Sequence, residues 1–133
     1  MIAATTLQLV LVTPETTLLD QPVTSLQFPL FDGQIGVLPG RAPLVGRLGV
    51  GALKFDSAAR SQTYYVEGGF AQIKGSVVTI LTNKAKLASD INLADAEAEM
   101  QAALDMTPTT DVEFAEKEHA LKRARALRNL GRR

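Results

Sequence analysis

The chain of 133 residues is long enough for one ordinary hydrophobic core, or for a compact domain with an appendage. Its 46% hydrophobic and 21% charged residues are typical of a globular protein, and its formal net charge is zero. The absence of cysteine excludes disulfides, thiolate zinc sites and cysteine nucleophiles. No apolar run approaches the length of about 18 residues that spans a bilayer.

The N-terminal segment Met-Ile-Ala-Ala-Thr-Thr-Leu lacks the basic region of a secretion signal and the arginines of a transit peptide. We therefore expect that the chain stays in the compartment where it is made, or that its first residue is that of a mature protein.

Residues 7–82 alternate between apolar and other side chains with the period of β-strands. Leu7, Leu9 and Leu11 show this pattern early, and the run 77–81 (VVTIL) shows it late. Gly, Pro or Asp interrupts the pattern every 8 to 12 residues or so, which predicts a small β-sandwich or barrel. Gly68-Gly69 predicts a bulge or a tight corner inside a strand pair, a structural role in preference to a functional one.

Residues 32–45 hold two glycine turns, a Pro-Gly corner and a second proline. These glycines and prolines lie among the apolar residues Ile35, Val37, Leu38 and Leu44. Because glycine supplies backbone angles that other residues avoid and proline fixes one dihedral angle, the segment predicts a shaped, partly buried loop and not a flexible linker. It contains no His, Cys or Ser and no cluster of carboxylates, so we interpret it as a docking surface and not a catalytic centre.

The following segment, residues 46–51 (GRLGVG), superficially resembles a nucleotide-binding loop. Its spacing matches neither of the two common glycine-rich nucleotide motifs, and no crossover helix is expected after it. We therefore expect no nucleotide site there.

The apolar period becomes helical from about Asn92. Asn92 is a predicted N-cap, and Pro108 ends this first helix because it cannot continue the hydrogen-bonding pattern. Thr110 and Glu113 form a predicted capping box for a second helix that runs to about Asn129. The pattern predicts an antiparallel helical hairpin after the β domain.

The second helix has apolar side chains on two arcs. One arc holds Val112, Ala120, Leu127 and Leu130, and the nearly opposite arc holds Phe114 and Leu121. A helix packed once on its own domain needs a single apolar stripe. Either one arc is simply exposed, or the helix uses different faces in different settings.

Charge is segregated along the chain. Residues 1–88 hold seven basic and five acidic side chains, residues 89–118 hold nine acidic side chains and one lysine, and residues 119–133 hold six basic and no acidic side chains. The basic tail is open to three interpretations: a solvated helix end that favours cations, a nucleic-acid patch, or a surface for an acidic protein. No aromatic residue lies in the tail to stack on bases.

Five stretches together resemble the epsilon subunit of the F-type ATP synthase. They are residues 11–15 (LVTPE), 32–44 (DGQIGVLPGRAPL), 66–70 (VEGGF), 77–81 (VVTIL) and 120–124 (ALKRA). Their order, their spacing and the total length agree with that family, and the glycine- and proline-rich block is its most specific part.

The resemblance implies an N-terminal β-sandwich of about ten strands in residues 1–86 and a C-terminal antiparallel two-helix hairpin in residues 87–133. It implies a non-catalytic rotor subunit of the central stalk, without cofactor or metal, that joins the gamma subunit to the membrane-embedded c-ring. The residues that would dock on gamma and the c-ring are Phe31, Asp32, Gln34, Ile35, Leu38, Arg41, Pro43 and Leu44. Many relatives have His in place of Arg41.

The resemblance also implies that the hairpin can extend along gamma, contact the alpha and beta subunits through its helices, and inhibit ATP hydrolysis. Its basic residues would then approach the acidic lever of a beta subunit, and they are Lys122, Arg123, Arg125 and Arg128. The subunit would be peripheral, on the cytoplasmic face of a bacterial inner membrane or the stromal side of a plastid thylakoid. The alternative function is a non-enzymatic adaptor that binds nucleic acid or an acidic partner through its basic tail.

Some bacterial relatives bind ATP on the folded hairpin through Ile-Asp followed by arginines. The corresponding stretch in this chain is residues 91–95 (INLAD), and residues 87–116 contain neither Lys nor Arg. Because an acidic helix repels a triphosphate, we expect ATP binding to be weak or absent.

Overall fold

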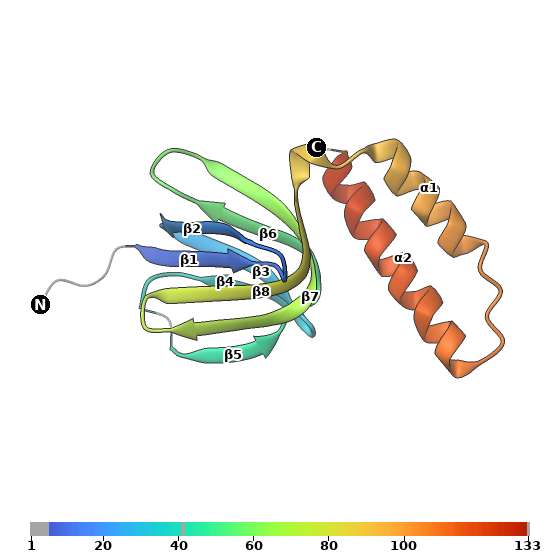
Figure 1. Cartoon of the computed structure of the whole chain (residues 1–133), viewed down its shortest axis with the longest axis horizontal. Helices are drawn as coiled ribbons and strands as arrows, with labels where there is room; N and C mark the ends of the chain where they lie inside the picture. Colours follow the sequence, from blue (N-terminus) through green and yellow to red (C-terminus); the bar gives the residue numbers. More distant parts are fainter. Residues whose placement is uncertain (1–5, 41, 133) are drawn as a thin grey trace, which may run out of the picture. The chain divides into compact units, whose positions relative to one another are not determined.

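The computed structural model describes residues 6–40 and 42–132, and the chain divides into two compact units, Met1–Ala85 and Lys86–Arg133. The first unit is a β-sandwich-like sheet, and the second contains two long helices that lie side by side (Figure 1). The expected fold class, a β-sandwich followed by a two-helix hairpin, is confirmed. The resemblance predicts this division one residue later, between residues 86 and 87.

The part of the chain that the structure describes forms eight strands, fewer than the ten or so expected. They are β1 (Leu7–Val12), β2 (Thr17–Val23), β3 (Ser25–Leu30), β4 (Gly33–Val37), β5 (Leu44–Arg47), β6 (Val50–Asp56), β7 (Ser61–Lys74) and β8 (Val77–Leu87). The hydrogen-bonded order is β2-β1-β8-β7-β6-β3-β4, with β5 pairing with β7. The number is lower because β7 and β8 are continuous over 14 and 11 residues.

The core of the sandwich follows the predicted alternation. Leu7, Leu9 and Leu11 of β1 are buried, as are Val78 and Ile80 of β8, which runs parallel to β1. The largest fully buried side chains from the other strands are Leu26, Phe28, Leu53, Phe55 and Ile73. Burial of these aliphatic and aromatic side chains is the main stabilising contribution to the first unit.

Strand β7 changes partner at Gly68 and Gly69. Its residues 61–67 pair with β6, and its residues 70–73 pair with β5. The two glycines between these segments have φ values of +67° and +109°, which residues with a Cβ atom rarely adopt. A Cβ atom on Gly69 would also lie 1.9 Å from the carbonyl oxygen of Leu81. The predicted corner is confirmed, and its reason is structural.

Gly46 and Gly49 allow the backbone of β5 and the segment after it to approach β3 closely. A Cβ atom on Gly46 would lie 3.2 Å from Leu30 Cδ2, and one on Gly49 would lie 2.7 Å from the Leu30 carbonyl oxygen. This contact accounts for two glycines of the segment that superficially resembled a nucleotide-binding loop.

The second unit consists of a short 3-10 helix, η1 (Ala88–Asp90), followed by α1 (Leu93–Leu104) and α2 (Asp111–Gly131). Both predicted caps are present: Asn92 Oδ1 accepts a hydrogen bond from the Asp95 backbone N–H at 3.1 Å, and Thr110 Oγ1 accepts one from Glu113 at 3.2 Å. These caps fix where the two helices begin.

The β6–β7 connection is closed by Asp56. Its Oδ2 atom accepts a hydrogen bond from Ser25 Oγ at 2.9 Å, and its Oδ1 atom accepts one from Ser61 Oγ. The bond from Ser61, followed by that from Ser25, lowers the pKa of Asp56 below its usual value of 3.8. A carboxyl group whose pKa is depressed by folding stabilises the fold above its unfolded pKa, and this stabilisation is lost as the pH falls through the folded pKa.

We therefore expect the Asp56→Asn variant to lose less stability than the parent chain when the pH is lowered from 5 to 3. Urea unfolding followed by circular dichroism at both pH values measures the difference. Asp32→Asn, in the exposed β3–β4 turn, is the matched control. Equal acid sensitivity of the Asp56→Asn variant and the parent chain would contradict the assignment.

Candidate docking surfaces

The structure divides the predicted docking segment between the two ends of β4. Phe31 and Asp32 form the turn that precedes β4, and Gln34 and Ile35 lie within this strand. Leu38 follows the strand at its other end, in the connection that leads through Pro43 to Leu44 at the start of β5. Arg41 lies outside the described residues. Because a strand rises about 3.3 Å per residue, the two groups are well separated.

The residues of this segment differ in how far their side chains are exposed to solvent. Phe31 and Leu38 are 65% and 64% exposed, and neither is needed to fill the core. Ile35 is half-buried and lies opposite Phe28 of β3, whereas Gln34 donates a hydrogen bond from Nε2 to the Ala52 carbonyl oxygen at 3.2 Å. Phe31 and Leu38 are therefore the best candidates in the segment for binding a partner.

A second exposed surface lies on the strands β5, β7 and β8, and we call it the outer face. It consists of the apolar side chains of Val45, Phe70, Val77 and Leu81 and of the cationic side chain of Arg47. Val45 and Arg47 point to the same side of β5, and Arg47 lies opposite Phe70 of β7. Val45 is 73% exposed and Phe70 is 54% exposed. The guanidinium carbon of Arg47 lies 5.0 Å from the centre of the Phe31 ring, so this face adjoins the β3–β4 turn.

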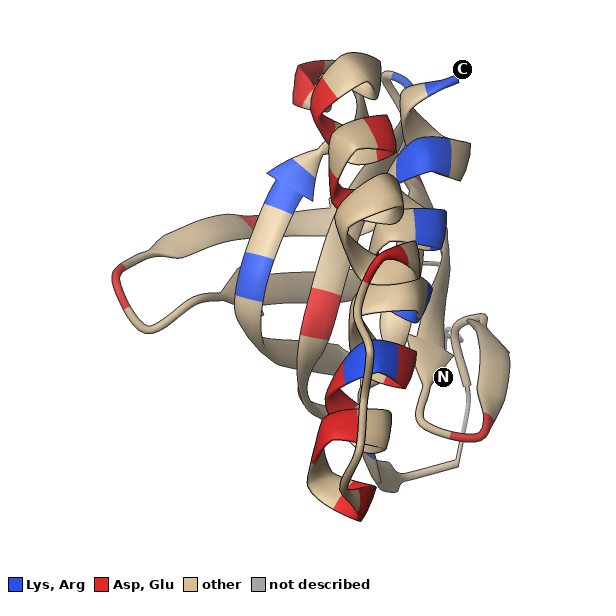
Figure 2. Cartoon of the chain, turned by 90° about the vertical axis from the view of Figure 1, so that its right-hand side faces the viewer, with Lys and Arg blue, Asp and Glu red and all other residues tan. Residues whose placement is uncertain are grey.

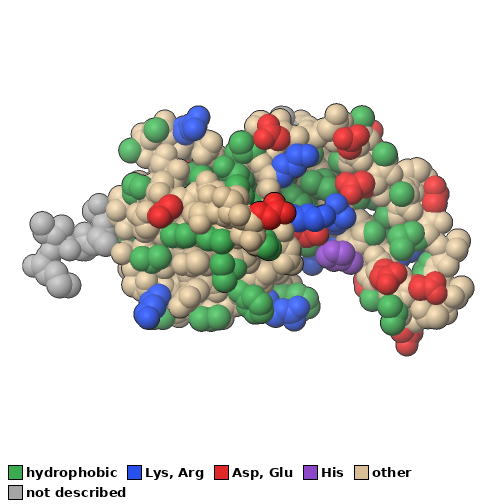
Figure 3. All heavy atoms as spheres, in the orientation of Figure 1, with side chains coloured by type: hydrophobic (Ala, Val, Ile, Leu, Met, Phe, Trp, Pro, Cys, Tyr) green, Lys and Arg blue, Asp and Glu red, His purple; other side chains and the backbone are tan. Residues whose placement is uncertain are grey.

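The outer face borders a pocket of about 490 Å³. Its wall is formed by β1, β5, β7 and β8 and by the residues that follow β1, and it includes Val12, Thr13, Arg47, Gly69, Phe70 and Leu81. In the space-filling view, patches of hydrophobic side chains lie among other side chains and backbone on the visible side of the first unit, and charged side chains are few (Figure 3). An exposed apolar surface with a pocket is typical of a protein-binding site.

Sequence reasoning missed the outer face, although the pattern contained a signal for it. In residues 77–81 (VVTIL) both alternating sets of side chains are largely apolar, and residues 9–12 (LVLV) are apolar throughout. A strand with water on one face alternates apolar and polar residues, so a continuous apolar run indicates that both faces are covered. Val78 and Ile80 fill the core, which leaves Val77 and Leu81 for the outer side.

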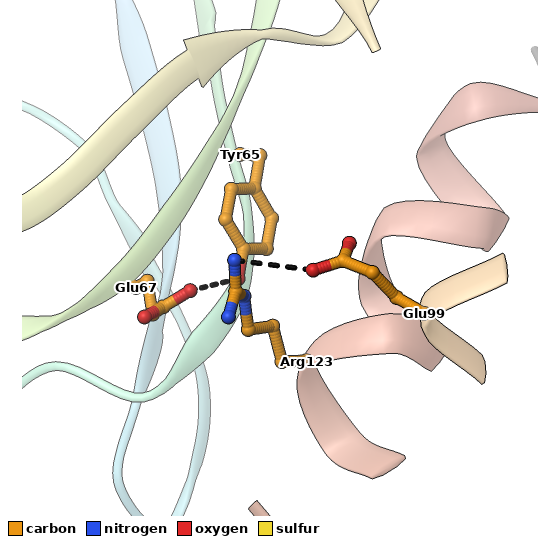
Figure 4. A network of polar contacts seen from close by, with 4 residues as sticks. All are labelled: Tyr65, Glu67, Glu99 and Arg123. Atoms are coloured by element: carbon orange, nitrogen blue, oxygen red, sulfur yellow. Dashed lines mark hydrogen bonds and ion pairs between the residues drawn. The ribbon is translucent and has the colours of Figure 1, made fainter. Parts of the chain in front are cut away.

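The four basic residues predicted to contact a partner differ in their surroundings within the second unit. Lys122 and Arg125 are exposed. Arg123 Nη2 forms an ion pair with Glu99 Oε1 of α1 at 3.2 Å (Figure 4). Arg128 is half-buried, and its Nε atom makes no hydrogen bond within the described part of the chain. Only Lys122 and Arg125 therefore present their charge fully to solvent.

The two apolar arcs of α2 also differ. Leu127 and Leu130 are buried, whereas Val112 of the same arc is exposed. Phe114 of the second arc is 59% exposed, and Leu121 is half-buried. Neither arc is wholly covered, so the structure leaves apolar side chains of α2 accessible at its N-terminal end.

Among residues 6–40 and 42–132, no three His, Cys, Asp or Glu side chains are grouped closely enough to bind a metal ion. None of the helices in these residues has the length and apolar character required to cross a membrane. The features that stand out in the described chain are surfaces suited to protein contacts.

Comparison with known proteins gives the family. Residues 6–88 match the ATP synthase, Delta/Epsilon chain, beta-sandwich domain family. The ATP synthase epsilon chain of Rhodopirellula baltica is 40% identical over 116 residues, which cover 87% of this chain and 91% of that protein. That of Solibacter usitatus is 36% identical over 123 residues, covering 91% and 92% of the two chains.

Relatives extend to plastids, since the chloroplastic epsilon chain of Piper cenocladum is 37% identical and the match covers 74% of each chain. A chain in the structure of the Euglena gracilis mitochondrial ATP synthase, which comprises OSCP, F1 and the c-ring, has the same fold with a TM-score of 0.88. It is 22% identical and the match covers 97% of this chain and 83% of that one. On the sequence matches, the chain belongs to the ATP synthase epsilon chain family.

Proposed function

We propose that the chain acts in the rotor of an F-type ATP synthase by joining the gamma subunit to the c-ring, and that it makes and breaks no bonds itself. The observation that carries this proposal is the apolar outer face beside the exposed Phe31 of the predicted docking segment. Surfaces of this kind on a paired β-sheet suit a permanent rotor contact, because a rigid sheet transmits torque without a large conformational change.

Strand β5 links the two ends of the predicted docking segment. It begins at Leu44, beside the connection that contains Leu38, and ends at Arg47, which contacts Phe31. Val45 lies between these ends and is more exposed than either Phe31 or Leu38. A band of exposed side chains that reaches both ends of the sheet can contact two different partners at once, as a subunit between gamma and the c-ring must do.

The test is reconstitution of the ATP synthase from the organism that encodes this chain. We expect complex depleted of the chain to lose coupling between ATP hydrolysis and ion pumping, and the added chain to restore it. Restored pumping, followed by a fluorescent ion-gradient dye in vesicles, supports the proposal. An unchanged gradient after depletion contradicts it. Salt-sensitive binding of RNA or DNA that is lost on deletion of residues 121–133 favours the adaptor alternative.

The second part of the proposal is that α2 restrains ATP hydrolysis through its basic residues. The charges of Lys122, Arg125 and Arg128 are concentrated in the second half of α2, where Figure 2 shows a row of blue segments. Such a surface attracts the acidic lever of a beta subunit. We predict that the hairpin binds ATP weakly or not at all.

Replacing Lys122, Arg125 and Arg128 together by Gln is expected to raise ATP hydrolysis by the assembled enzyme. Three charge contacts at about 0.5 kcal/mol each, summed, lower the equilibrium constant for forming the inhibited state by roughly an order of magnitude. Arg123 is retained because it pairs with Glu99. Steady-state hydrolysis by the purified complex measures the effect, and Arg60→Gln with Lys74→Gln on the sandwich is the control. Unchanged hydrolysis would exclude inhibition by these three charges.

A further inference from the structure

The hairpin places charges of opposite sign side by side. Near one end, a Cβ atom on Gly131 would lie 3.2 Å from Ile91 Cγ2, so the end of α2 lies beside the segment that leads into α1. Near the other end, Lys117 Nζ donates to the Met106 carbonyl oxygen at 3.0 Å. The basic second half of α2 therefore runs along the acidic α1, as the red and blue segments in Figure 2 show.

The ion pair between Glu99 and Arg123 joins the two helices near their middle. Its N–O distance is 3.2 Å, and the two side chains are 42% and 34% exposed. The pair borders a pocket of about 290 Å³ whose other walls come from Ala102, Ala103, Met106 and Ala120. Short side chains in the seam between the helices leave room at the pair, so water reaches it and its strength is moderate.

Apolar packing between the helices is limited by composition. The buried side chains of α1 are Ala96, Met100 and Ala103, and those of α2 are Ala124, Leu127 and Leu130. Half of these six are alanines, which bury little apolar surface each. A moderate charge contact is therefore a substantial fraction of the free energy that closes the hairpin.

We infer that α1 is an internal acidic partner for the basic face of α2, with Arg123 shared between two states. In the closed hairpin Arg123 pairs with Glu99, and in the open hairpin the same guanidinium is released for a carboxylate of another protein. Hairpin closure and partner binding then compete for one positive charge, and closure needs no bound nucleotide. This inference rests on the proposed inhibition for its effect on hydrolysis, although the closing contact itself does not.

The first experiment measures hairpin opening in the complete isolated chain. Because the chain has no cysteine, Ala98→Cys and Asn129→Cys provide two exposed positions for labels in a single-molecule energy-transfer measurement. Titration with urea brings the open form into the measurable range for every variant. We expect Glu99→Gln to raise the opening constant about two- to fivefold, the range set by exposed ion pairs.

Matched variants separate this contact from the general charge of α1. Glu97→Gln removes an exposed carboxylate two residues away, on another side of the helix, and is expected to leave the opening constant unchanged. The Glu99→Lys and Arg123→Glu exchange is expected to restore much of the closure that either single change removes. Equal opening constants for Glu99→Gln, Glu97→Gln and the parent chain would overturn the inference.

The second experiment uses the assembled ATP synthase and distinguishes the two proposals. If both are correct, Glu99→Gln lowers ATP hydrolysis, because more of the hairpin is open and available to inhibit, while Glu97→Gln does not. If Glu99→Gln opens the hairpin but leaves hydrolysis unchanged, the internal ion pair stands and the inhibitory function is contradicted. If hydrolysis falls without a change in opening, the closing role of Glu99 is overturned.

Discussion

Replacing Gly69 with alanine is expected to destabilise the β-sandwich by about 3 kcal/mol or more. A positive φ costs a residue with a Cβ atom about 1–2 kcal/mol, and overpacking adds about 1–3 kcal/mol. Both costs apply here, because Gly69 has a φ of +109° and its Cβ atom would lie 1.9 Å from the carbonyl oxygen of Leu81. Denaturant unfolding of the isolated chain measures the loss, which is a large fraction of the stability of an ordinary domain.

Gly75 is the matched control for this prediction. It also has a positive φ, +61°, but nothing lies within 4 Å of a Cβ atom built on it. Gly75→Ala should therefore cost only the conformational part, about 1 kcal/mol. If the two variants were equally stable, the close approach of β8 to the β7 corner would not be a constraint on the fold.

Replacing Phe70 with aspartate is expected to weaken assembly of the chain into the ATP synthase by at least about 30-fold, while the fold stays intact. Phe70 is 54% exposed, so a polar side chain at this position leaves the core filled. Loss of an aromatic anchor from an interface commonly costs about 2 kcal/mol or more, and a desolvated carboxylate adds to this cost. The measurement is a titration of depleted complex with the variant, followed by recovery of ion pumping.

Phe114→Asp provides the comparison, because Phe114 of α2 is exposed to a similar extent, 59%. Assembly through the outer face predicts that the Phe114→Asp variant assembles with nearly the affinity of the parent chain. Equal loss of affinity in both variants would show that a general increase in negative charge, and not the outer face, is responsible.

Several features of the fold could be predicted from local patterns. Alternation of Leu7, Leu9 and Leu11 predicted a core strand, and the capping residues Asn92 and Thr110 predicted where both helices begin. These features depend on neighbours within a few residues along the chain, which is why a sequence pattern records them. The strand number could not be predicted as well, because a glycine corner can either end a strand or redirect one, as it does in β7.

The candidate surfaces needed the fold itself. The docking segment is continuous along the chain, yet β4 separates Phe31 from Leu38 in space. Strand β5 brings Arg47 onto the Phe31 ring. Likewise, the sequence pattern does not distinguish the four basic residues in the second half of α2, whereas the structure pairs Arg123 with Glu99.

By itself, the sequence determined the family, the order of a β unit and a helical unit, and the segregation of charge along the tail. Only the tertiary structure decided which apolar side chains remain outside the core and which charges pair across the hairpin. The physical reason is that periodicity and capping act between near neighbours in the chain, whereas exposure and ion pairing depend on residues brought together by strand pairing and helix packing.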